Sequence, residues 1–118
     1  MKPVFFLFAC VATSAHATEM DFVTDPSVCG LELIDRHEKA MTFDGANFWE
    51  IEYHCEVQPA ITPPDWKTDI TEVRPGYCEE PGAVFPEMFV FRSGPQEPGL
   101  LYVYGHNGDP VIYHLCPQ

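Results

Sequence analysis

The side chains best suited to chemistry lie in one stretch, from Asn47 to Val57, in which apolar and charged residues alternate. Side chains of a β-strand point alternately to opposite faces, so this pattern predicts a half-buried strand. One predicted face belongs to the core and comprises Trp49, Ile51, Tyr53, Cys55 and Val57. The other is an acidic face that carries Glu50, Glu52, His54 and Glu56 beside Phe48.

Paired carboxylates could act as a general acid and a general base. Residues two apart on a strand lie about 6.6 to 6.8 Å apart, within the separation that inverting glycosidases use. A small carboxylate-dependent hydrolase built on Glu50 and Glu52 is therefore one hypothesis. However, any strand with alternating acids has this spacing, and a general acid needs a partly desolvated site. We therefore favour a solvated binding face.

Histidines offer a second kind of chemistry. His106 and Asp109 share a turn and His114 lies on the next expected strand, so these three could ligate zinc or copper in an envelope metal-binding protein. Calcium needs six to eight oxygen ligands, which carboxylates along one strand do not supply. No cofactor motif is present in the sequence.

Other enzyme classes lack their motifs. Ser27 and Ser93 are the serines outside the expected leader, and neither lies in a Gly-x-Ser-x-Gly elbow. Lys39 and Lys67 do not follow a glycine-rich phosphate loop. We therefore expect a protein without catalytic activity.

The N-terminus has the pattern of a secretory signal peptide. Residues 1–17 contain one basic residue, a short apolar run and the cleavage motif Ala15-His16-Ala17. The apolar run is too short to cross a bilayer, so we expect no transmembrane segment and a periplasmic or extracellular protein. Cys10, preceded by Leu7-Phe8-Ala9, is an alternative lipidation site.

Four cysteines remain after cleavage: Cys29, Cys55, Cys78 and Cys116. An even number in an exported chain predicts two disulfides, since their spacing does not suit structural zinc. Three pairings are possible, and we favour Cys29 with Cys55 and Cys78 with Cys116, which would pin the C-terminus.

Charge restricts the partners. The chain has 18 acidic residues, and removal of Lys2 leaves five basic ones, a net charge of −13 with histidine neutral. Nucleic acid and anionic membrane surfaces are excluded as direct ligands, because their phosphates require Lys and Arg. The charge is compatible with a cationic partner such as a basic protein, although acidity that only keeps an exported protein soluble is the simpler interpretation. Trp66, after Pro63-Pro64-Asp65, could anchor it or instead cover the core.

Turn signals divide the rest of the chain. We expect a flexible acidic segment over residues 18–27, whose Met20, Phe22 and Val23 could still pack on an edge, and a single β domain over residues 28–118. Strands are expected at residues 28–36, 41–43, 47–57, 66–74, 84–92, 100–104 and 111–116, with turns or loops at 44–47, 58–65, 75–82, 93–99 and 105–110. This predicts a mainly β fold, a small antiparallel β-sandwich or open barrel of about six to seven short strands with two disulfides.

Together these observations predict a small exported, acidic, non-enzymatic protein. It would bind a partner through Glu50, Glu52, His54 and Glu56, with Trp66 as a further candidate. In size, acidity and compartment the chain is similar to the small periplasmic inhibitors of lysozyme, whose target is a basic protein. This similarity is one of character rather than of motif.

Overall fold

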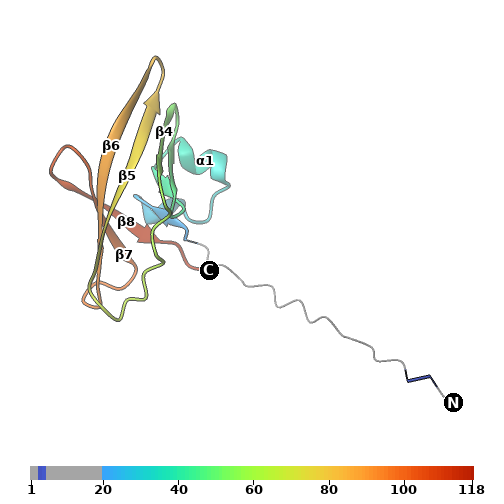
Figure 1. Ribbon diagram of the computed structural model, residues 1–118. Helices are drawn as coiled ribbons and strands as arrows, with labels where there is room; N and C mark the ends of the chain where they lie inside the picture. Colours follow the sequence, from blue (N-terminus) through green and yellow to red (C-terminus); the bar gives the residue numbers. More distant parts are fainter. Residues whose placement is uncertain (1–2, 5–19) are drawn as a thin grey trace.

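The computed structural model describes residues 3–4 and 20–118 (Figure 1). The predicted signal peptide and Cys10 therefore lie, apart from residues 3 and 4, outside the described part of the chain. Within that part, the helices are too short to cross a membrane.

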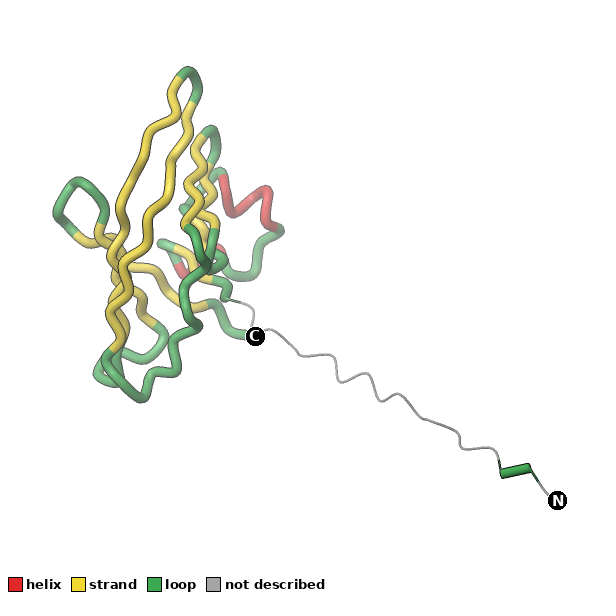
Figure 2. Tube along the Cα trace, in the orientation of Figure 1, coloured by secondary structure: helices red, strands yellow, loops and turns green. Residues whose placement is uncertain are grey.

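Eight antiparallel strands form a closed barrel in which each strand pairs with its neighbour in sequence and β1 pairs with β8. Strands and loops, with short helical segments, make up the described domain (Figure 2). The strands are β1 (Phe22–Val23), β2 (Thr42–Phe43), β3 (Asn47–Glu50), β4 (Tyr53–Val57), β5 (Ile70–Glu80), β6 (Ala83–Ser93), β7 (Leu100–Tyr104) and β8 (Pro110–Leu115). The helical segments are the 3-10 helix η1 (Pro26–Val28) and the helix α1 (Leu33–His37). The prediction of a mainly β, antiparallel fold with two disulfides is confirmed, with eight strands rather than six or seven.

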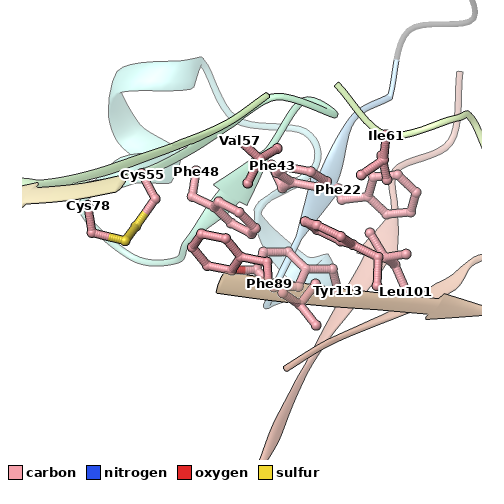
Figure 3. Close-up of a cluster of buried hydrophobic side chains, with 12 residues drawn as sticks. Phe22, Phe43, Phe48, Cys55, Val57, Ile61, Cys78, Phe89, Leu101 and Tyr113 are labelled. Carbon is pink, nitrogen blue, oxygen red and sulfur yellow. A yellow bond between two sulfur atoms is a disulfide. The ribbon is translucent and has the colours of Figure 1, made fainter. Parts of the chain in front are cut away.

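Aromatic rings fill the barrel (Figure 3). Phe43 stacks on Phe48 with ring centroids 4.2 Å apart and on Phe91 at 5.3 Å. Alternate residues of the last strands complete the core, since Leu101 and Tyr113 are 1% and 3% exposed. Burial of each such side chain contributes about 1.5 to 3 kcal/mol to the free energy of folding, so this cluster accounts for much of the stability.

The N-terminal segment joins the barrel instead of preceding it. Phe22 and Val23, from the expected flexible segment of residues 18–27, are almost fully buried and pair with both β2 and β8. They close the barrel, which would otherwise have open edges on β2 and β8.

A second buried cluster lies beside β1 and contains Val23, Val28, Ala40 and Cys116. The strand predicted for residues 28–36 is wrong, because this stretch forms the end of η1, a turn and α1. Of the alternating apolar residues, Cys29 and Leu31 pack against this second cluster, whereas Leu33 is 61% exposed. The buried Arg36 instead fixes the turn, donating to the Leu31 carbonyl at 3.0 Å and to Asp21 Oδ1 at 2.7 Å.

The single strand predicted for residues 47–57 is also wrong. A two-residue turn at Ile51 and Glu52 divides it into β3 and β4, and Glu52 takes a positive φ of 58°. The turn reverses the expected faces of β3 but not of β4: Phe48 lies opposite Cys55 and both point into the core, where Cys55 and Val57 were predicted to lie. Trp49 lies opposite His54 on the outer face.

The predicted turn at residues 75–82 is confined to Pro81 and Gly82, because β5 continues as far as Glu80. Glycine at position 76 reflects the close approach of β4: a Cβ there would lie 2.1 Å from the Glu56 carbonyl oxygen.

The predicted disulfide pairing is wrong as well. The bonds are Cys29–Cys116 and Cys55–Cys78. Cys55 and Cys78 are opposed residues of neighbouring strands, whereas Cys116 follows β8 and reaches the turn after η1. The strands ending the chain were placed nearly as they occur, with β6, β7 and β8 within one residue of prediction at each end.

Candidate functional site

Two hairpins extend side by side at one end of the barrel (Figure 1). The β3–β4 and β5–β6 hairpins belong to one continuous sheet, since His54 of β4 lies opposite Glu79 of β5. An open groove of about 560 Å³, which we call the tip groove, lies at the ends of the two hairpins. It is lined by Trp49, Glu50, Glu52, Tyr53, His54, Glu79, Glu80, Pro81, Gly82, Ala83 and Val84.

Four carboxylates surround the tip groove: Glu50, Glu52, Glu79 and Glu80. All four residues are exposed. Of these four, only Glu79 has a basic side chain within 4.0 Å in the described part of the chain, because its Oε1 lies 2.8 Å from His54 Nδ1. The other three have no cation within 4.0 Å among residues 3–4 and 20–118. The groove thus presents concentrated negative charge to solvent.

Nearby carboxylates also affect the pKa of Tyr53, which lines the tip groove. Burial, followed by the negative charges of Glu87, Glu80 and Glu50, raises the pKa of the Tyr53 hydroxyl. The Tyr53 hydroxyl can donate a hydrogen bond, whereas the four carboxylates at the groove can only accept.

His54 positions one side of the groove. Its ring stacks on Trp49 with centroids 4.0 Å apart, and His37 from α1 stacks on Trp49 at 6.3 Å. His54 Nδ1 lies 2.8 Å from Glu79 Oε1, and Nε2 lies 2.9 Å from Asn47 Oδ1. These two contacts and the stacking on Trp49 fix the orientation of the His54 ring.

Apolar side chains accompany the charge. Trp49, Ile51 and Val84, at or beside the groove, are 41%, 58% and 70% exposed. Exposed apolar groups that are rimmed by polar residues mark interaction surfaces, because burying them against a partner releases water. A mixed acidic and apolar surface suits a partner that carries both cationic and apolar side chains.

The fold places some of the predicted site residues at the tip groove and others elsewhere. Glu50, Glu52 and His54 line the tip groove. Glu56 does not: its carboxylate accepts hydrogen bonds from Gln58 and the Tyr77 hydroxyl at 2.9 Å, and these lower its pKa. Trp66 packs against the core, edge-on to Phe22 at 6.4 Å, and therefore covers one part of the barrel interior.

The residues of the metal alternative are not brought together. His106 hydrogen-bonds to Glu87 of β6, and His114 lies five residues beyond Asp109, near the far end of β8. No group of three or more potential ligands among the described residues could hold a metal ion. The geometry therefore gives this alternative no support.

The sequence patterns did not identify several residues of the tip groove as site residues. Glu79, Glu80 and Val84 were assigned to a turn or to an ordinary strand, and Trp49 and Ile51 to the core. Adjacent acids immediately before Pro81-Gly82 were the available signal, because Pro-Gly marks a hairpin turn that exposes its neighbours.

Comparison of the chain with protein-family models, curated proteins and solved structures finds no match.

Proposed function

We propose that this chain is an exported, non-enzymatic protein that binds a cationic protein through the tip groove. The observation that carries the proposal is the gathering of four exposed carboxylates with three exposed apolar side chains at the ends of two adjacent hairpins. The carboxylates would attract a basic partner at long range, and the apolar groups would be buried on contact.

Binding is favoured over hydrolysis by the state of the carboxylates. All four are exposed to water, and a general acid requires a desolvated carboxyl with a raised pKa. The groove is also open rather than enclosed, so it does not exclude water from a reacting bond. Its chemistry suits recognition of lysine and arginine side chains.

Export is supported by the signal-peptide pattern of residues 1–17 and by the two disulfides, which persist in oxidising compartments. The expected location is the periplasm or the extracellular space. A cationic protein present in that compartment is the proposed partner.

The test is calorimetric titration of the oxidised chain, beginning at residue 18, with lysozyme as a basic probe. Binding is expected at about 20 mM salt and should weaken at least tenfold at about 300 mM, because salt screens exposed charges. The triple variant Glu50→Gln, Glu52→Gln, Glu80→Gln should lose most of the affinity.

A matched variant separates local charge from total charge. Glu32→Gln, Glu38→Gln, Asp109→Asn removes three exposed carboxylates outside the groove and none that accepts a side-chain hydrogen bond among the described residues. It should bind nearly as the wild type does. Equal weakening by both triple variants would show that total charge alone attracts the probe and would contradict the proposal, as would the absence of binding at low salt.

A further inference from the structure

A second hollow, of about 270 Å³, lies on the outer face of the barrel where β5, β6 and β7 meet the loop between β6 and β7. It shares no lining residue with the tip groove. Its lining includes Arg92, Tyr102 and Tyr104. The hollow is thus separate from the surface assigned to the cationic partner.

The strands place these side chains together. Leu101 and Val103 of β7 are buried in the core, so Tyr102 and Tyr104 project from the opposite face. Arg92 of β6 lies directly opposite Tyr102. Neighbouring positions across an antiparallel pair lie about 4.5 to 5.5 Å apart, which brings the guanidinium and the phenol rings into one surface.

Polar contacts order the side chains at the edge of the hollow. The Tyr102 hydroxyl donates a hydrogen bond to Glu97, and Arg92 Nη1 lies 3.5 Å from the Tyr104 hydroxyl. Asp69 completes the opposite edge beside Gly94, where a Cβ would meet its Oδ1 at 2.3 Å. Position 94 therefore has to be glycine for this carboxylate to remain in place.

The composition of the hollow restricts its ligand. One guanidinium and two carboxylates give nearly balanced charge, unlike the tip groove, which has four carboxylates and one histidine. An anionic ligand would meet Asp69 and Glu97, and a cationic ligand would meet Arg92. A purely apolar ligand would leave these charged groups desolvated without partners, which is costly.

A ligand with many hydroxyl groups avoids these penalties. Hydroxyls both donate to carboxylates and accept from a guanidinium, and the C–H face of a sugar ring can pack on a phenol ring. At about 270 Å³ the hollow is slightly smaller than the pockets of drug-sized ligands, which measure about 300 to 1,000 Å³, and this size suits a ligand of one ring. We propose that it binds one ring of a neutral saccharide.

The experiment records ¹H–¹⁵N NMR spectra of the oxidised chain from residue 18 with methyl glycosides of glucose, galactose, mannose and N-acetylglucosamine. At least one should shift the amide signals of residues 92–104, saturating below about 50 mM, since weak ligands have millimolar dissociation constants. Glucuronic acid and glucosamine, which are anionic and cationic relatives, should bind more weakly.

Variants test the assignment. Arg92→Gln should weaken the binding of the best glycoside about tenfold, as expected when a charged hydrogen-bonding group is removed. Tyr102→Phe should weaken it less, because the ring is retained. Tyr77→Phe is the matched control: it also loses a tyrosine hydroxyl bonded to a carboxylate, that of Glu56, but lies outside the hollow.

Three results would overturn the inference. The first is that no neutral glycoside shifts the spectrum at about 50 mM, well above a millimolar dissociation constant. The second is that the shifts map to residues outside the hollow. The third is that glucuronic acid binds most tightly, which would make Arg92 a carboxylate site.

Discussion

Cys55 of β4 and Cys78 of β5 lie directly opposite each other, with their Cα atoms 4.0 Å apart. The next opposed pair toward the hairpin ends is His54 and Glu79, which line the tip groove. The disulfide therefore fastens the two hairpins together at the base of the groove.

The two disulfides should differ in their effects on stability and binding. Cys55–Cys78 closes a sequence separation of 23 residues and Cys29–Cys116 one of 87. The chain-entropy relation then predicts losses of about 3.4 and about 4.6 kcal/mol in the free energy of unfolding for the respective double alanine variants. Denaturant unfolding measures both. At a temperature where both variants are folded, only the Cys55/Cys78 variant should bind lysozyme more weakly, and equal affinities would contradict this role.

Gly76→Ala should strongly destabilise the barrel. The added Cβ would lie 2.1 Å from the Glu56 carbonyl oxygen, so β4 and β5 would have to separate. We expect a loss of about 2 kcal/mol or more in the free energy of unfolding, comparable with overpacking in a core. Gly82→Ala is the control: it has open space around its Cβ position, and its positive φ of 83° costs about 1 kcal/mol. A lower urea midpoint for Gly82→Ala than for Gly76→Ala would contradict the close approach of β4 to β5 at Gly76.

Sequence patterns predicted the fold class because strand alternation and turn residues act locally. β6, β7 and β8 lie between strong turn signals, and they were placed nearly as they occur. The barrel's closure could not be predicted, since it depends on Phe22 and Val23 pairing with a strand about 90 residues later. No local pattern encodes such a partner.

The sequence predicted the part of the candidate site that is local in sequence. Glu50, Glu52 and His54 were identified because acids and a histidine cluster in sequence. Glu79 and Glu80 join them only through the pairing of β4 with β5, a contact between distant segments. Alternation also continues through the turn at Ile51 and Glu52, so periodicity alone could not reveal that the core face changes from Trp49 to Phe48.

Alkaline unfolding should depend on Tyr113. Its hydroxyl is buried, and burial, followed by the charges of Glu50 and Tyr53, strongly raises its pKa. A raised folded-state pKa means that the unfolded chain releases this proton first. The contribution to stability is therefore complete below about pH 10 and is lost as the pH rises further.

Tyr113→Phe should accordingly reduce the slope of unfolding free energy against pH above about pH 10. Urea unfolding between pH 8 and 11 measures the slope, and tyrosinate absorbance follows ionisation. An unchanged slope in the variant would show that Tyr113 does not couple folding to alkaline pH.

Two substitutions of His54 should separate its two roles. His54→Phe keeps a ring on Trp49 but removes the hydrogen bonds to Glu79 and Asn47, whereas His54→Ala removes both the ring and the bonds. Loss of a stacked ring and of a charge-assisted hydrogen bond each cost about 1 to 2 kcal/mol, so His54→Ala should be the less stable variant. His114→Ala, on β8 and outside the groove, serves as the control.

The affinity for lysozyme should depend on an aromatic ring at position 54, which holds Trp49 in place. His54→Phe holds Trp49 in place and frees the Glu79 carboxylate, so its affinity at low salt should equal or exceed that of the wild type. His54→Ala should bind more weakly, because Trp49 loses the ring that orders it and has to be immobilised on binding. Calorimetric titration of both variants gives the ranking. If His54→Ala instead binds more tightly than His54→Phe, the partner recognises charge alone, and the apolar half of the tip groove takes no part in binding.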